Sequence, residues 1–283
     1  MSETFGTRLE RAMRSRGPLC VGIDPHRSLV ESWGLAYDLA GLERFALTCV
    51  EAFAGRVAAV KPQSAFFEVF GSPGVAVLER VLTELRDADT LTILDVKRGD
   101  IGSTMTAYAE AHLGKDAVAP ADAITVSPYL GYESLRPAID LARATARGVF
   151  VLALTSNPEG VPVQHARHGD ESVAASMVSG AGEDNAEARA RSELGHVGLV
   201  VGATVRSAVR ELGLDLEAAA TPILAPGYGA QGGDVRALEE TFGEARRQVL
   251  ASSSRDVLSA GPEPHRLVDR VQQTVAELAD WVG

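Results

Sequence analysis

The chain has 283 residues, of which 46% are hydrophobic, and it carries a formal net charge of -11. This length can bury a sizeable core, and the acidic balance argues against nucleic acid or an anionic membrane as the main partner. The sequence shows no apolar signal-peptide core and no run of roughly 20 apolar residues, so we expect a cytoplasmic protein without a membrane span.

Eight short runs rich in Val, Ile, Leu and Ala predict strands that are buried on both faces. They lie at 19–24, 57–61, 91–97, 122–126, 149–155, 197–202, 222–226 and 248–252. Apolar residues at three- and four-residue spacing predict helices between them, at 40–55, 74–88, 103–114, 132–146, 204–212 and 233–247. This alternation is typical of a (β/α)8 TIM barrel of ~250 residues, and we expect residues 1–283 to form one such α/β domain. A doubly wound open sheet is the alternative.

The connection after the fifth predicted strand is the longest, from Thr155 to about Glu193. It contains a polar stretch at 157–172, followed by a helical stretch that we expect to be broken at "SGAGEDN", residues 179–185. Functional loops of such barrels gather at the C-terminal ends of the strands. An insertion of this length at that end is therefore a candidate lid.

Charges of both signs follow the third predicted strand directly, in "ILDVKRGDIGST", residues 93–104. Residues two apart in a strand share a face, so Asp95 and Lys97 would both face the barrel mouth. Asp100 lies just past the strand end, and Lys61 ends the neighbouring strand. Such a cluster either closes the barrel as a salt-bridge network or marks an active site, because buried charges are costly unless they are paired.

Two later loops suit an anion. The segment "PGYGAQGGD", residues 226–234, offers backbone N–H groups ahead of a predicted helix, and "SSSR", residues 252–255, follows the eighth predicted strand. Barrels of this kind frequently hold phosphate between the loops after strands 7 and 8. The glycines are not followed by Gly-Lys-Ser/Thr, so this is not a Walker loop, and a glycine-rich tight turn stays the alternative.

Neither a metal site nor a dinucleotide fingerprint is evident in the sequence. His165 and His168 are three residues apart in a polar loop, with no carboxylate or cysteine at ligand spacing, and we expect both to face solvent. Cys20 and Cys49 are too few for a disulfide framework, so we expect reduced packing thiols. We therefore predict no metal ion and no cofactor.

The string "DVKRGDIGST", residues 95–104, resembles the signature of the orotidine 5'-phosphate decarboxylase family. Further similar segments follow in the family's order, from about residue 18 to 260: "GIDP" at 22–25, "VKPQSAFFE" at 60–68, "TVSPYLG" at 125–131, "TSNPEG" at 155–160 and the glycine-rich loop. The length and the "TSNP" connection resemble the longer bacterial branch. The resemblance implies cofactor-free decarboxylation of orotidine 5'-phosphate to UMP and CO2, the last step of de novo pyrimidine synthesis.

The resemblance also implies a role for each catalytic position. Lys97 would protonate C6 of the pyrimidine, and Asp95 would sit beside the substrate carboxylate. Lys61 and Asp100 would complete the charge network. Asp100 and Thr104 would reach into the active site of the other subunit of a homodimer.

The substrate-binding positions follow in the same way. The resemblance places Asp24 and Lys61 at the ribose hydroxyls, Ser127 at the pyrimidine edge, and Gln231 with Arg255 at the phosphate. Ser254 precedes the phosphate arginine, where the family often has Gly. The backbone contact at this position is therefore not implied, whereas the role of the arginine is.

Two other functions fit parts of this pattern. The first is a keto-sugar phosphate decarboxylase or aldolase on a related barrel, although the sugar-phosphate decarboxylases of that ancestry need a divalent metal. A non-catalytic barrel that binds nucleotides would hold UMP-like ligands tightly without turning them over. Chelation tests the first alternative, and turnover tests the second.

Overall fold

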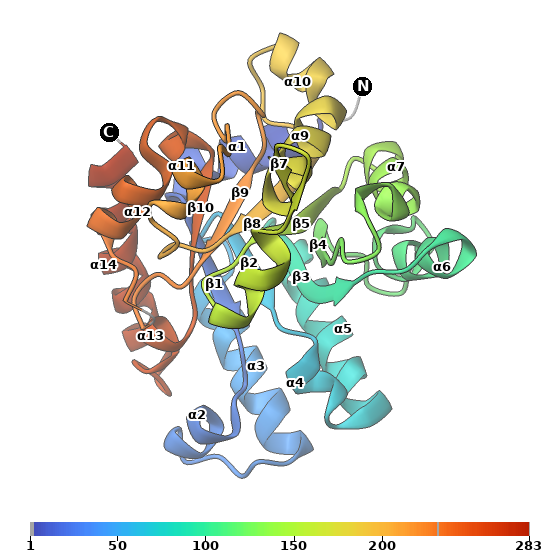
Figure 1. The fold of residues 1–283 in the computed structure, drawn as a ribbon. Coiled ribbons are helices and arrows are strands. Elements are labelled where there is room, and N and C mark those ends of the chain that lie inside the picture. The colour runs from blue at the N-terminus through green and yellow to red at the C-terminus, as the bar shows by residue number, and fades with distance from the viewer. Residues whose placement is uncertain (1–2, 231, 283) are drawn as a thin grey trace.

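A computed structural model describes residues 3–230 and 232–282 of the chain. Eight parallel strands close into a barrel in which β10 returns to pair with β1 (Figure 1). Around the barrel they are β1 (Leu19–Ile23), β2 (Ala59–Pro62), β3 (Leu91–Arg98), β4 (Ala123–Val126), β5 (Gly148–Leu154), β8 (Val197–Val201), β9 (Ile223–Pro226) and β10 (Val249–Ser253). The predicted (β/α)8 barrel is confirmed, and the alternative prediction of a doubly wound open sheet is wrong. Each predicted strand matches a barrel strand to within two residues at either end.

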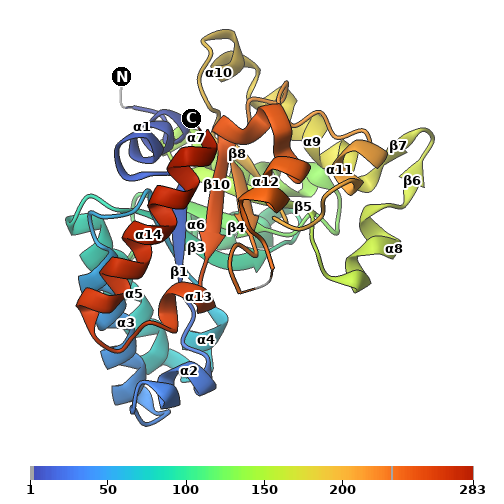
Figure 2. The ribbon, with the colours of Figure 1, turned by 90° about the vertical axis from the view of Figure 1, so that its left-hand side faces the viewer.

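Helices surround the barrel and follow its strands (Figures 1 and 2). The α-helices are α1 (Phe5–Arg16), α2 (Arg27–Ser32), α3 (Leu39–Phe53), α4 (Ala65–Glu68), α5 (Gly71–Asp87), α6 (Gly102–Leu113), α7 (Arg136–Ala144), α8 (Val161–Gln164), α9 (Val173–Asp184), α10 (Ala186–Ala190), α11 (Ala208–Glu211), α12 (Val235–Phe242), α13 (Arg255–Leu258) and α14 (Pro264–Val282). Short 3-10 helices are η1 (Tyr132–Leu135), η2 (Pro158–Gly160) and η3 (Gly243–Gln248). Among the described residues, no helix is long and apolar enough to cross a membrane.

Two predicted helices are shorter than expected. The segment at 204–212 is helical only in α11, because Arg206 has a left-handed φ of 50° and its N–H donates to the side chain of Thr241. The segment at 233–247 leaves the α-helical path at Phe242 and continues as η3. The C-terminal helix α14 was not predicted.

The barrel interior is apolar at its N-terminal end, where each strand contributes an inward side chain. This layer consists of Cys20, Ala59, Ile93, Ala123, Phe150, Val200, Leu224 and Leu250. Helix α1 covers the layer, and Phe5 meets the ring of Phe150 edge-on at 6.0 Å. Gly198 leaves room for Phe150, since a Cβ there would lie 2.5 Å from the ring. The polar inward residues are therefore confined to the opposite, C-terminal end. Both cysteines are free and buried, as expected.

The connection between β5 and β8 holds η2, α8, a hairpin of β6 (Arg167–His168) and β7 (Glu171–Ser172), α9 and α10. Figure 2 shows α8 and the hairpin projecting to one side of the barrel. The expected helix break at 179–185 occurs only at the last residue of that segment, because α9 continues to Asp184 and Asn185 separates it from α10. Gly180 serves close packing instead, since a Cβ there would lie 2.9 Å from the ring of Tyr132. The side chain of Asn185 then fixes the helix end by hydrogen bonds to both backbone groups of Val197.

Candidate active site

Four charged side chains form a chain of alternating sign across the C-terminal mouth of the barrel. Lys97 Nζ lies 2.6 Å from Asp95 Oδ1, and Lys61 Nζ lies 3.1 Å from Asp95 Oδ2. Lys61 Nζ is in turn 4.0 Å from Asp24 Oδ1. The side chains come from β3, from β2 and from the residue after β1. Adjacent strands thus bring together three residues of the predicted charge cluster and one predicted ribose contact.

Asp95 is the centre of this arrangement. It is 5% exposed, and it accepts two further hydrogen bonds, from Gln63 Nε2 at 2.8 Å and from Thr125 Oγ1 at 2.8 Å. Burial alone would raise the pKa of Asp95, but the ammonium groups of Lys61 and Lys97 and the hydrogen bonds from Lys97 and Thr125 lower it to about 2. Asp95 is therefore a fixed negative charge at neutral pH.

The two lysines differ in their exposure. Lys61 is buried, which alone would lower its pKa, but the carboxylates of Asp24 and Asp95 raise the pKa above its ordinary value. The side chain of Lys97 is 46% exposed. Lys61 is thus a fixed internal cation, while Lys97 can contact a molecule that enters the mouth.

The backbone at Lys97 is unusual for a residue with a side chain. Its φ is 44°, in the left-handed region, and the pairing of β3 with β4 shifts register between Leu94 and Arg98. Conformations of this kind cost roughly 1–3 kcal/mol and persist where surrounding contacts impose them. Here the Lys97 N–H donates to Thr125 Oγ1 at 3.0 Å, so one threonine fixes both the Lys97 backbone and the Asp95 carboxylate.

Sequence reasoning assigned no role to Gln63 and Thr125, and it considered Ser254 only in relation to the phosphate. Ser254 Oγ donates to Asp24 Oδ2 at 2.6 Å, and the other two hold Asp95. The period of two along a strand could have found them, because residues two apart share a face. Gln63 is two residues after Lys61, Thr125 is two residues before Ser127, and Ser254 is two residues after Ser252.

Asp24 keeps one acceptor without a donor. Its Oδ1 is buried, and among the described residues nothing donates a hydrogen bond to it. A buried acceptor without a donor costs free energy, so this oxygen is suited to a hydroxyl group of a ligand. The geometry fits the implied ribose contact.

The structure places the remaining predicted residues around the mouth. Ser127 follows β4, and its N–H donates to the carbonyl of Arg98 at 2.8 Å. Arg255 is exposed at the start of α13. Gln231 lies outside the described residues. The glycine-rich loop connects β9 with α12 and contacts β10 through a hydrogen bond from the Tyr228 N–H to the Ser252 carbonyl at 3.2 Å.

Asp100 and Thr104 do not join the charge network within the described chain. The Asp100 carboxylate accepts a hydrogen bond from the N–H of Ile101 at 2.8 Å, and Thr104 is exposed on α6. Large apolar side chains are exposed on the loops after β3 and β4, with Ile101 at 62%, Tyr129 at 80% and Leu130 at 54%. This part of the surface, on the loops after β3 and β4, is unusually apolar for a region in contact with water.

Metal-binding geometry is not found in the part of the chain that the structure describes, since no three His, Cys, Asp or Glu side chains come together as potential ligands. His168 is exposed in β6, and His165 is partly exposed just after α8. Neither histidine belongs to the charge network.

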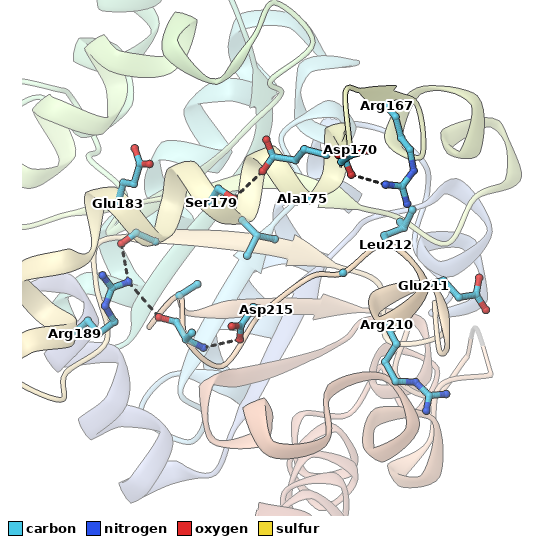
Figure 3. A pocket seen from close by; sticks show the side chains of 16 residues that line it. Arg167, Asp170, Ala175, Ser179, Glu183, Arg189, Arg210, Glu211, Leu212 and Asp215 are labelled. Carbon is cyan, nitrogen blue, oxygen red and sulfur yellow. Dashed lines mark hydrogen bonds between the residues drawn. The ribbon is translucent and has the colours of Figure 1, made fainter.

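A separate groove of about 660 Å³ lies between α9 and residues 210–219 (Figure 3). None of the predicted site residues lines it. Within the groove, Arg189 Nη1 donates to the carbonyls of Gly182 and Ala218, each at 3.2 Å. This arginine connects the end of α9 to the segment before β9, so it anchors the second half of the connection after β5.

Comparison with known proteins identifies the family of the chain. Residues 17–270 match the model of the "Orotidine 5'-phosphate decarboxylase / HUMPS family". The chain belongs to this family. It is 57% identical over 263 residues to an orotidine 5'-phosphate decarboxylase of Streptomyces coelicolor, covering 92% of each chain, and 54% identical over 276 residues to that of Salinispora arenicola, covering 97% of each.

Solved structures show the same similarity. The crystal structure of a candidate orotidine 5'-phosphate decarboxylase from Streptomyces avermitilis has a TM-score of 0.94 and 54% identity, covering 99% of this chain and 96% of that one. The Leishmania donovani OMP decarboxylase has a TM-score of 0.76 and 29% identity, covering 99% of both chains. The family resemblance stated from the sequence motifs is confirmed.

Proposed function

We propose that the protein decarboxylates orotidine 5'-phosphate to UMP and CO2, without a cofactor, as the last step of de novo pyrimidine synthesis in the cytoplasm. The observation that carries the proposal is the contact of Lys97, Asp95 and Lys61 at the mouth of the barrel. Membership of the family supports it, as do relatives named for this activity that match over almost the whole chain.

In the proposed step, the bond between C6 of the pyrimidine and the carboxylate carbon breaks, and its electron pair stays on C6 while CO2 leaves. No carbonyl adjacent to C6 can delocalise this pair, so a fixed positive charge beside C6 lowers the barrier. Lys97 Nζ supplies that charge and then transfers a proton to C6 as a general acid. Solvent returns the proton to the lysine, which is partly exposed.

Asp95 has two parts in this proposal. It holds the Lys97 ammonium at 2.6 Å, so the proton donor is in place before the bond breaks. Its own charge lies beside the substrate carboxylate, which is lost in the reaction, so the repulsion is relieved as CO2 forms. Lys61 supports Asp95 from the opposite side, at 3.1 Å.

The rest of the substrate is held by residues around the network. We assign the ribose hydroxyls to Asp24 and Lys61, since Asp24 Oδ1 is a buried acceptor without a donor among the described residues. Ser127 contacts the pyrimidine edge. The phosphate is assigned to Arg255, Gln231 and the N–H groups of the glycine-rich loop. Binding energy from this remote phosphate can close the connection after β5 over the site.

The protein is further proposed to act as a homodimer, with Asp100 and Thr104 of each subunit completing the partner's site. The exposed apolar side chains of Ile101, Tyr129 and Leu130, on the loops after β3 and β4, support this assignment, because a second copy would cover them. No other class of macromolecule is proposed as a partner.

The test is the change in ultraviolet absorbance when purified protein is mixed with orotidine 5'-phosphate, with and without EDTA. Conversion to UMP that EDTA does not affect is the expected result. Conversion that EDTA abolishes would mean metal-dependent chemistry, as in the related sugar-phosphate decarboxylases. Tight UMP binding without conversion would mean a non-catalytic nucleotide-binding barrel, and either result would refute the proposal.

A further inference from the structure

One face of the C-terminal helix α14 contacts both segments to which we assign phosphate binding. Arg270 and Glu277 are seven residues apart, about two helical turns, so they lie on the same side of α14. Arg270 Nε and Nη2 lie 2.9 and 2.5 Å from Oδ2 of Asp256, the residue after Arg255. Glu277 Oε2 accepts a hydrogen bond at 2.9 Å from the hydroxyl of Tyr228, in the glycine-rich loop.

These contacts are connected with one another. Arg270 Nη1 lies 3.8 Å from Glu277 Oε1. On the other side, Gly229 of the loop lies directly against Asp256, since a Cβ at Gly229 would be 2.8 Å from the Asp256 Cβ. Its φ of 81° also favours glycine. The loop, the start of α13 and α14 thus form one closed set of contacts, which we call the α14 brace: Tyr228, Asp256, Arg270 and Glu277.

Three residues of the α14 brace are largely buried, whereas the side chain of Glu277 is 42% exposed. Tyr228 is buried, and the side chains of Arg270 and Asp256 are about three-quarters buried, with exposed fractions of 24% and 26%. Charge-assisted hydrogen bonds in such surroundings are stronger than ion pairs on an open surface. Burial and the hydrogen bond to Glu277 raise the pKa of Tyr228, so its hydroxyl remains a donor at neutral pH.

The charge of Asp256 explains why the arginine side chain of Arg270 is needed beside it. It is an anion directly beside Arg255, where a phosphate with negative charge is assigned, and like charges at short range repel. Two N–H groups of Arg270 on the same Asp256 oxygen neutralise this carboxylate and keep it on the α14 side. Without Arg270, the carboxylate would be free to repel the phosphate or to pair with Arg255.

We propose that Arg270 and Glu277 are positioning residues that set the affinity for the 5'-phosphate without touching the substrate. Arg270 holds Asp256 away from Arg255, and Glu277 holds the glycine-rich loop through Tyr228. The inference rests on the proposed function only in placing the phosphate at Arg255 and this loop. The family model ends at residue 270, so Glu277 and the rest of α14 lie beyond the matched segment.

The test compares UMP with uridine, which lacks the phosphate, by calorimetric binding to the full chain. Arg270→Met should lower the affinity for UMP about tenfold, because the Asp256 carboxylate loses its charged hydrogen bonds and is free to repel the phosphate or to pair with Arg255. The affinity for uridine should stay within about twofold of the wild-type value. The matched control is Arg266→Met, one turn earlier on α14, where the exposed arginine lies 3.7 Å from Glu263 and has no other ion pair among the described residues. The control should change neither affinity.

A rescue distinguishes positioning from a merely structural role. The double variant Arg270→Met/Asp256→Asn should recover most of the UMP affinity, because the uncompensated carboxylate is gone. Glu277→Met, which removes the acceptor of the Tyr228 hydroxyl, provides an independent test, with the same selective loss of UMP, should Arg270→Met not fold. Equal losses for UMP and uridine, no loss in either, or no recovery in the double variant would overturn the inference. Failure of the proposed function gives a different result, a wild-type protein that does not convert orotidine 5'-phosphate.

Discussion

Asp95→Asn tests how much the charge network contributes to the folded state. The folded-state pKa of Asp95 falls from an ordinary 3.8 to about 2, because Lys61, Lys97 and Thr125 stabilise the carboxylate more than burial destabilises it. A lowering of this size corresponds to about 2.5 kcal/mol of stability at neutral pH. Since the folded pKa is lowered, this stability is present above about pH 4 and is lost as the pH falls through about 2.

Urea unfolding of the wild type and of Asp95→Asn at two pH values measures this contribution. At pH 7 the variant should be less stable by about 2.5 kcal/mol. At pH 3 the difference should fall to about half, because the Asp95 carboxylate of the unfolded chain is then mostly protonated while that of the folded protein is still mostly ionised. Asp116→Asn, at an exposed position, is the matched control and should change stability by less than about 0.5 kcal/mol.

A variant as stable as the wild type at pH 7 would refute this reasoning. It would mean that removing Asp95 and Lys61 from water costs as much free energy as their ion pairs return, as happens in some buried ion-pair networks. A stability difference that stays constant between pH 7 and pH 3 would also refute it, since the difference would then come from packing and not from the charge of Asp95.

Three further predictions concern activity. Arg255→Ala should raise KM for orotidine 5'-phosphate strongly, and an unchanged KM would place the phosphate elsewhere. Mixing inactive Lys97→Ala and Asp100→Ala chains should restore part of the activity through hybrid sites, whereas confirmed heterodimers without activity would reject shared sites. Thr125→Val should lower kcat about 10- to 100-fold because the Lys97 backbone loses its anchor, while Thr125→Ser keeps the hydroxyl and most of kcat. Equal kcat values for the two Thr125 variants would argue against that role.

The barrel could be predicted from the sequence because its strands are buried on both faces and read as uninterrupted apolar runs. Side chains two residues apart in a strand share a face, which predicted that Asp95 and Lys97 lie together. The same rule applied to every strand would also have predicted Gln63 and Thr125 as residues of the site. The left-handed backbone of Lys97 could not be predicted, since it lies where the pairing of β3 with β4 shifts register, and that pairing is a tertiary contact.

Elsewhere tertiary packing overrode local preference. The glycines of α9 suggest a break, yet Gly180 lies in a continuous helix, where the ring of Tyr132 leaves no room for a side chain. The α14 brace joins residues 14 to 49 positions apart, and no local pattern in the sequence indicates that they meet.

The turnover of Lys97→Ala, measured alongside its affinity for UMP, tests the central claim most directly. If Lys97 supplies both the charge beside C6 and the proton, turnover should fall by several orders of magnitude while UMP still binds. Turnover near that of the wild type would contradict the account, because another group would then have to protonate the pyrimidine.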